Sequence, residues 1–288
     1  MSPSGLAAIL GLASALCFGV GNFAAQRLTA RHGWLRALLA VQALSLPLVV
    51  GLALAVDGVP VLEARSLLLL LGLGLLNVFG LAAMYRSFAV GALSVVAPIA
   101  SSFAATTVAL SAISGRAPAG STAIGLAAIV IGVAVVSGAG GAGGGATGGR
   151  RAGVLWACVA SLSLGTVFFG LGGATSSLGA LWPVVALRIV GVTALVGMRR
   201  GAGEGQPGFV WPTVITVAVL DTGGMVIYSM GTQHGDVAVV AVLASLFSVV
   251  TIALAQLRLR ERLARAQWVG VVMVLLGTAW VTYRANAG

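Results

Sequence analysis

The sequence predicts an all-α integral membrane protein of ten transmembrane helices, arranged as two inverted five-helix repeats. Three observations lead to this prediction. First, 59% of the 288 residues are hydrophobic and only 8% are charged, whereas a soluble domain has about 25% charged residues. Second, the apolar runs are long and do not alternate, which excludes an outer-membrane β-barrel. Third, several short motifs occur twice at a nearly constant shift.

Ten apolar runs are long enough to span the roughly 30 Å hydrocarbon core, which takes about 20 helical residues. The first run carries no basic residue before it, so we interpret it as a retained span and not as a signal peptide. The expected spans are 5–25, 35–56, 66–85, 92–113, 120–138, 152–172, 180–198, 210–230, 236–256 and 265–283. The loops between them must be short, which leaves no room for a soluble domain.

A glycine-rich segment between the fifth and sixth runs divides the chain. Gly138, Gly140 and Gly143 match the dinucleotide fingerprint G-x-G-x-x-G. That fingerprint also needs a preceding strand and an acidic residue about 20 positions later, and the next acid here is Glu204. We therefore expect a flexible linker over 139–151. It joins a first five-helix repeat at 1–138 to a second at 152–288.

The repeat itself is visible in paired motifs. Gly125 and Gly132 recur as Gly270 and Gly277 at a shift of 145, and Ala100-Ser101-Ser102-Phe103 resembles Ala244-Ser245-Leu246-Phe247 at a shift of 144. Because each half has an odd number of spans, the second half must enter the membrane upside down. Inverted repeats of this kind are typical of secondary transporters, whose site lies near the midplane between the halves.

The repeat pattern resembles a known family, and the resemblance covers the whole chain, in both halves. The run Ala241–Ala255, the Glu261-Arg262-Leu263 hairpin and Gln267-x-x-Gly270 are similar to EamA-type members of the drug/metabolite transporter superfamily. The first half departs from the pattern at Gly115-Arg116-Ala117, where Glu-Arg is usual. The resemblance implies ten helices, both termini in the cytoplasm and transport of a small organic solute, without implying which solute.

Two ionisable residues lie well inside expected spans: Arg188 and Asp221. Such groups are functional candidates because hydrocarbon disfavours charge. Asp221, Met225 and Tyr228 share one helix face. Asp221 could bind a proton or a cationic group, and Arg188 could pair with Asp221 or hold an anionic group. The alternative is a static Asp221–Arg188 pair that only fixes two helices.

Uncharged polar residues within spans form a second group of candidates. Asn22 and Gln26 share one face of the first span, and Asn77 lies deep in the third. Ser101 on the fourth span and Ser245 and Ser248 on the ninth occupy comparable places. Each of these side chains could contact the solute, or it could simply bond across a helix interface. His32 and His234 are expected in loops.

The charges give two conflicting indications of orientation. All sixteen cations are arginines, and the net charge is +10. The arginines stand at the ends of apolar runs, so membrane lipids and not nucleic acid are the expected partners. The positive-inside rule places both termini outside, whereas the family resemblance places both inside. Carboxy-terminal fusions to a fluorescent protein and to a phosphatase would decide between them.

The sequence thus predicts a multi-pass protein of the cytoplasmic membrane that moves a small organic solute by alternating access. Protons are a candidate coupling ion, and no cofactor, metal or enzymatic activity is expected. Either a monomer or a homodimer is compatible with the sequence. The alternatives are a non-transporting scaffold or accessory subunit, and a lipid-modifying membrane enzyme. The enzyme would need a cluster of nucleophile, base or metal ligands that two histidines, two separated cysteines and scattered acids do not supply.

Overall fold

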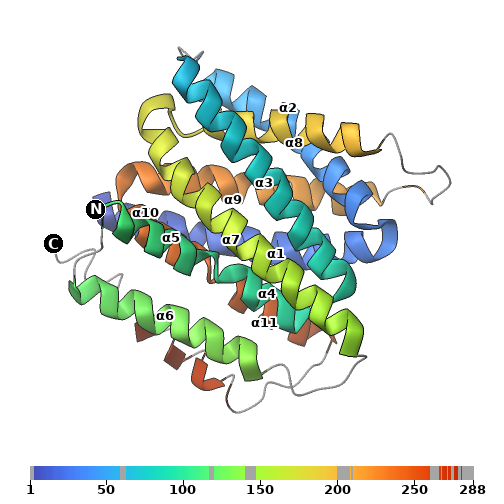
Figure 1. Ribbon diagram of the computed structural model, residues 1–288, viewed down its shortest axis with the longest axis vertical. Helices are drawn as coiled ribbons and strands as arrows, with labels where there is room; N and C mark the ends of the chain where they lie inside the picture. Colours follow the sequence, from blue (N-terminus) through green and yellow to red (C-terminus); the bar gives the residue numbers. More distant parts are fainter. Residues whose placement is uncertain are drawn as a thin grey trace.

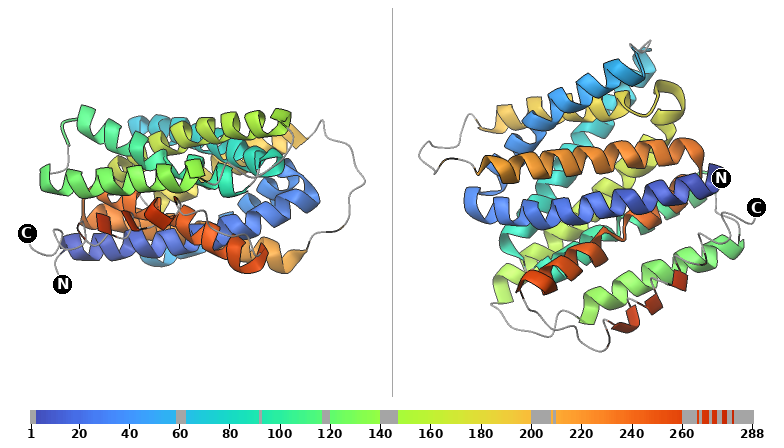
Figure 2. Two further views of the ribbon diagram at one scale, coloured as in Figure 1. Left: turned by 90° about the horizontal axis from the view of Figure 1, so that it is seen from below. Right: turned by 180° about the vertical axis from the view of Figure 1, so that it is seen from behind.

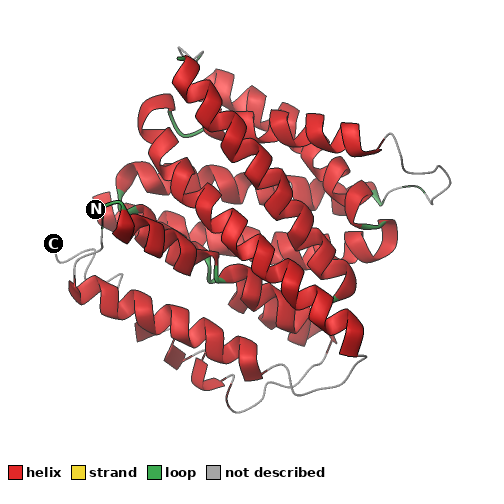
Figure 3. Ribbon diagram, viewed as in Figure 1, coloured by secondary structure: helices red, strands yellow, loops and turns green. Residues whose placement is uncertain are grey.

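The computed structural model describes residues 3–58, 63–91, 93–116, 120–139, 147–199, 208 and 210–259, and scattered positions from 266 to 280. All regular structure in this part of the chain is helical (Figure 3). The helices are α1 (Pro3–His32), α2 (Trp34–Val56), α3 (Ala64–Val90), α4 (Leu93–Ser101), α5 (Phe103–Ile113), α6 (Gly120–Ala139), α7 (Thr147–Leu178), α8 (Trp182–Arg199), α9 (Trp211–His234), α10 (Val237–Ala244) and α11 (Phe247–Leu259).

Six apolar helical segments of the described chain are long enough to cross a membrane. They are Pro3–His32, Trp34–Val56, Ala64–Val90, Arg151–Leu178, Trp211–His234 and Val237–Leu257, and shorter apolar helices cover Ile99–Ile113, Ala123–Gly132 and Trp182–Met198. The outer faces are apolar as well. Leu68 on α3 is 72% exposed and Leu155 on α7 is 67% exposed. Leucines facing outward are expected where the surroundings are lipid and not water.

The first nine expected spans each coincide with described helices, whereas the tenth falls mostly outside the described residues. Several helix boundaries differ from expectation. Helix α7 begins at Thr147, so residues 147–151 of the expected linker are helical. His32 and His234, expected in loops, are the last residues of α1 and α9.

The fourth and ninth expected spans are each interrupted near the middle, which the apolar pattern did not indicate. Between α4 and α5, the Ser102 hydroxyl donates to the carbonyl of Ile99 at 2.6 Å. Between α10 and α11, the Ser245 hydroxyl donates to the carbonyl of Val242 at 2.7 Å. The same bond to a carbonyl three residues back also occurs inside unbroken helices, at Ser87 on α3 and Ser176 on α7, so it accompanies the breaks without explaining them. Both breaks fall in the motif that recurs at a shift of 144.

The two halves also share hydrogen bonds at matched positions. The Thr107 hydroxyl on α5 donates to the carbonyl of Gly165 on α7 at 2.9 Å. The Thr251 hydroxyl on α11 donates to the carbonyl of Gly19 on α1 at 3.0 Å. In both places a threonine that follows the helix break joins the first helix of the other half. We call these two contacts the threonine–glycine crossings.

Glycines mark equivalent turns in the two halves. Gly33 joins α1 to α2 with φ 75°, and Gly179 follows α7 with φ 78°. This left-handed conformation strongly favours glycine because it has no Cβ. Gly91 follows the end of α3, and Gly235 follows the end of α9. The four glycines provide a register for comparing one half with the other.

The helices of the two halves interleave. Helix α1 runs antiparallel beside α9, and α7 runs antiparallel beside α3, in the two most extensive helix contacts (Figures 1 and 2). Helix α1 also contacts α10 and α11, α7 contacts α4 and α5, and α2 packs on α8. Helix α6 lies at one edge of the molecule in Figure 1. There the Trp280 indole donates to the carbonyl of Ser121 at 2.8 Å.

Small residues at the threonine–glycine crossings are expected to be essential for packing. A Cβ at Gly165 would lie 2.5 Å from the carbonyl oxygen of Phe103, and one at Gly19 would lie 2.5 Å from the Cβ of Val250. Gly165→Ala and Gly19→Ala should each destabilise the protein by about 1–3 kcal/mol, because the helices must separate. Thermal unfolding of the purified protein in detergent measures this effect.

Gly173→Ala is the matched control for this pair. Gly173 also lies on α7, and a Cβ there would meet nothing within 4 Å. The control should change stability by less than about 0.5 kcal/mol. Equal melting temperatures for Gly165→Ala and Gly173→Ala would contradict the close helix crossing.

Candidate functional site

A cluster of polar side chains lies inside the helix bundle. Arg188 on α8 is only 1% exposed, and its Nη2 donates to Oδ2 of Asp221 on α9 at 2.6 Å. Its Nη1 donates to Oε1 of Gln42 on α2. This is the only ion pair within the described part of the chain. The pairing of Arg188 with Asp221 that the sequence left open is therefore present.

Asp221 also lines a small central cavity. The cavity volume is about 30 Å³, which is room for roughly one or two water molecules. Its lining residues are Phe18, Asn22, Asn77, Leu81, Met84, Ala100, Phe103, Leu164, Phe168, Asp221, Met225 and Phe247. They come from both halves of the chain. Asp221, with its side chain 19% exposed, is the least buried of them.

Aromatic rings form much of the cavity wall. The Phe168 ring stacks on Phe103 with centroids 4.6 Å apart and meets Tyr228 edge-on at 4.5 Å. Phe103 also stacks on Phe247 at 6.1 Å with an interplanar angle of 8°. Phe103 and Phe247 are the first residues after the two helix breaks. The breaks therefore place one aromatic ring from each half at the cavity.

Asn77 is a fully buried polar side chain of the cavity that has no hydrogen-bond partner among the described residues. It is 1% exposed, and neither its Nδ2 nor its Oδ1 has a hydrogen-bond partner in the protein. A buried amide without a partner loses about 1–3 kcal/mol of hydration. Buried polar groups of this kind point to a ligand or to water that completes their bonds. Asn77 therefore belongs to the part of the cavity that is equipped to bind something polar.

When the two halves are compared by these four glycines, Gln42 is equivalent to Arg188, and Asn77 is equivalent to Asp221. Gln42 and Arg188 each stand nine residues after a glycine of positive φ, Gly33 and Gly179. Asn77 and Asp221 each stand fourteen residues before the glycine that ends their helix. The contact between Gln42 and Arg188 thus joins equivalent positions of the two halves. The first half thus has the neutral amides Gln42 and Asn77 at the positions where the second half has the charged Arg188 and Asp221.

The structure brings only some of the sequence-predicted residues to the cavity. Arg188, Asp221, Asn22 and Asn77 belong to the cavity or to the cluster beside it. Tyr228 does not line the cavity. Its hydroxyl donates to the carbonyl of Phe168, a lining residue, at 3.2 Å. The shared face of Asp221, Met225 and Tyr228 is therefore only partly a cavity face.

The remaining polar candidates lie elsewhere. Gln26 is partly buried and lines neither the cavity nor the cluster. Ser245 and Ser248 are buried and donate to the carbonyls of Val242 and Ser245, and Ser101 is buried outside the cavity. These two bonds are local and do not cross a helix interface, so they match neither solute contact nor the cross-helix bonding considered for these serines. Glu261, Arg262 and Gln267 lie outside the described residues, and Gly270 is buried.

Sequence reasoning missed Gln42 and the phenylalanines. Gln42 is an amide within an apolar span, the same signal that identified Asn77, and it is 0% exposed. Nothing in the sequence distinguishes Phe103, Phe168 and Phe247 from ordinary core residues. Among the described residues, no three His, Cys, Asp or Glu gather as metal ligands, and Cys17 and Cys158 are not joined in a disulfide.

Comparison with known proteins finds a family model that matches the second half of the chain. The model of the EamA-like transporter family matches residues 151–283. No curated protein matches the chain. Among solved structures, 26 chains match. One of them, described only as "Crystal structure of protein", has a TM-score of 0.76 and 17% identity, and the alignment covers 98% of each chain. That likeness shows a shared fold.

The family match covers the second half of the expected resemblance, from α7 through α8, α9, α10 and α11, and does not extend to the first half. Together with six apolar helical segments long enough to cross a membrane, it makes this a multi-pass membrane protein. The resemblance to EamA-type members of the drug/metabolite transporter superfamily is therefore confirmed, with residues 151–283 forming an EamA-like transporter unit.

Proposed function

We propose that the protein is a secondary transporter of the cytoplasmic membrane that moves a small organic solute by alternating access. The architecture would be ten helices in two inverted repeats, 1–138 and 152–288, joined by the glycine-rich linker. The paired helix breaks, the paired threonine–glycine crossings and the equivalent glycines support this architecture. The site would lie between the repeats, as in other inverted-repeat transporters.

The central cavity is the proposed substrate site. The observation that carries this proposal is the unpartnered, buried amide of Asn77 beside the Asp221 carboxylate in an otherwise apolar chamber. Apolar walls with a few polar groups that fix orientation are typical of small-molecule sites. The matching solute has an apolar body, which would pack on rings such as Phe168 once the chamber widens beyond its present volume of about 30 Å³, and a polar group that Asn77 binds.

Asp221 is the proposed coupling residue. A proton taken up by its carboxylate would remove the negative charge that now faces the Arg188 guanidinium. The guanidinium cannot release its own proton, so it would have to turn to another acceptor, of which Gln42 already supplies one. Protonation of Asp221 would thus loosen the contact between α8 and α9. The coupling of solute flux to proton flux follows from this arrangement.

Flux measurements test the proposal. Cells producing the wild type or Asn77→Leu, which has a similar volume but no amide, are compared by metabolite profiling of cytosol and medium. One solute should be redistributed by the wild type and not by the variant. The same solute should then cross the membrane of liposomes that contain only this protein. No redistribution of any solute, with both proteins present in the membrane, would favour the scaffold or accessory subunit instead.

A further inference from the structure

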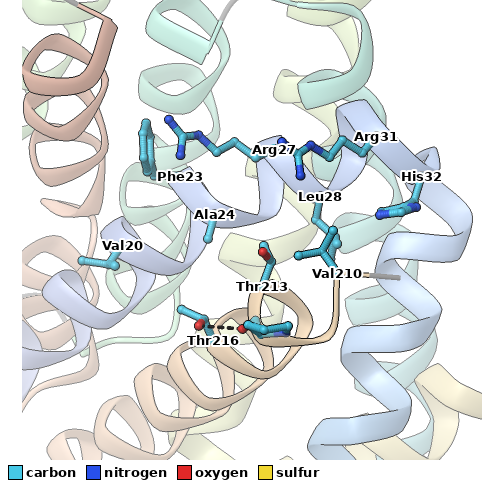
Figure 4. A pocket seen from close by; sticks show the side chains of 11 residues that line it. Val20, Phe23, Ala24, Arg27, Leu28, Arg31, His32, Val210, Thr213 and Thr216 are labelled. Carbon is cyan, nitrogen blue, oxygen red and sulfur yellow. Dashed lines mark hydrogen bonds between the residues drawn. The ribbon is translucent and has the colours of Figure 1, made fainter. Parts of the chain in front are cut away.

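A second and larger cavity lies at the end of α1. Its volume is about 330 Å³, which is within the range of ligand pockets, about 300–1,000 Å³. Its lining residues are Val20, Phe23, Ala24, Arg27, Leu28, Arg31, His32, Val210, Pro212, Thr213 and Thr216. We call it the α1–α9 pocket (Figure 4). It shares no residue with the central cavity.

The pocket forms where the two helices cease to touch closely. Gly21 allows α1 to approach Leu220 of α9, and its Cβ would lie 3.4 Å from the Leu220 Cβ. Because the helices are antiparallel, the chain beyond Gly21 faces the beginning of α9 at Val210. In Figure 4, Arg27 and Arg31 extend along one side of the pocket, and Val210 and Thr213 lie on the other.

The pocket is basic on one side. Arg27 and Arg31 are exposed, and neither forms an ion pair with a described residue. His32 lies beside them, and the lining contains no Asp or Glu. Two guanidinium groups without acidic neighbours favour an anion, and their planar donors match the oxygens of a phosphate. The Arg27 guanidinium lies 4.7 Å from the centroid of the Phe23 ring, which holds its stem along the pocket.

The α9 side of the pocket has Thr213 and Thr216 beside Val210 and Pro212, and an apolar surface adjoins the pocket. Val20 and Val210 line the pocket and are each 37% exposed, and Ile215 and Val219 of α9 are each 49% exposed. Trp211 is 58% exposed at the first position of α9. Tryptophan at a helix end is typical of the headgroup level of the membrane. A ligand in this pocket would contact the guanidinium groups at one end and apolar side chains at the other.

We propose that the α1–α9 pocket binds one anionic phospholipid. The phosphate lies between Arg27 and Arg31, and an acyl chain follows the apolar strip from Val20 along α9. Basic pockets between transmembrane helices are known to take anionic headgroups. A free phosphate would use the arginines but not the apolar strip, so the combination of the two favours a lipid. Because α9 carries Asp221, the lipid would contact the helix of the proposed coupling residue.

Lipid binding to the purified, full-length protein tests the proposal. The probes are phosphatidylglycerol, phosphatidylcholine with the same acyl chains, and inorganic phosphate. Phosphatidylglycerol should raise the melting temperature by several degrees and remain bound in native mass spectrometry, since a ligand of the folded state stabilises it. Arg27→Gln/Arg31→Gln should weaken this binding by about tenfold or more, through loss of the charge-assisted bonds.

Arg65→Gln/Arg116→Gln is the matched control, because both residues are exposed and lie outside the pocket. It should bind phosphatidylglycerol as the wild type does. Arg27→Lys/Arg31→Lys keeps the charge without the planar donors and should bind with intermediate affinity, which also covers the case of a misfolded glutamine variant. Equal loss in the control, or full stabilisation by inorganic phosphate or phosphatidylcholine, would overturn the assignment of an anionic lipid.

Discussion

Replacing Asp221 by asparagine is expected to abolish solute transport while the protein remains in the membrane at normal abundance. Asparagine keeps an oxygen that can accept from Arg188, so the contact now 2.6 Å long can persist in neutral form. It cannot take up or release a proton, which is the step assigned to Asp221. Transport should fall at least about tenfold, which corresponds to about 1.4 kcal/mol or more in the activation free energy.

Counterflow or uptake in liposomes measures this loss, and immunoblots of the membrane fraction measure abundance. Glu63→Gln is the matched control, because Glu63 is exposed and its side chain makes no capping hydrogen bond at the start of α3. It should transport at the rate of the wild type. Full activity of Asp221→Asn would contradict this role and would mean that the ion pair only links α8 to α9.

The second large effect concerns stability. Asp221→Leu removes the acceptor altogether and leaves the guanidinium of Arg188, 1% exposed, with only Gln42 as a partner. Breaking a buried ion pair from one side costs about 3–5 kcal/mol, whereas replacing both members by apolar residues is often neutral. Asp221→Leu should therefore lower the melting temperature strongly, and Arg188→Met/Asp221→Leu should recover most of the loss.

Arg188→Met alone completes this cycle. It should destabilise less than Asp221→Leu, because a lone carboxylate can take up a proton and a guanidinium cannot give one up. Thermal unfolding in one detergent gives all four values. The double variant should be stable but inactive in liposomes, which separates the structural contribution of the pair from its part in transport. A double variant as unstable as Asp221→Leu would contradict the assignment of the loss to an unpaired charge.

Much of the fold follows from simple properties of the sequence. Long apolar runs locate nine of the ten expected spans on described helices, because hydrocarbon permits only helices whose backbone is fully bonded. The charges within spans, Arg188 and Asp221, identify the polar cluster for the same reason. Charged residues within an apolar run are rare, and they are therefore easy to detect in a sequence.

The breaks within the fourth and ninth spans were not predictable in this way. Ser102 and Ser245 read as ordinary small residues of an apolar helix, and only the structure shows each hydroxyl bonded to a carbonyl three residues earlier. The aromatic residues of the cavity wall could not be predicted from the sequence either. Phe103 and Phe247 become distinctive only because a break turns each of them toward the cavity, and an apolar residue carries no mark of the direction in which it points.

The small volume of the central cavity has a consequence for the transport cycle. At about 30 Å³, with Phe103 and Phe247 stacked at its wall, the chamber closes around nothing larger than water. In the proposed transporter, a solute larger than water therefore enters this chamber only if the stacked rings of Phe103 and Phe247 move apart.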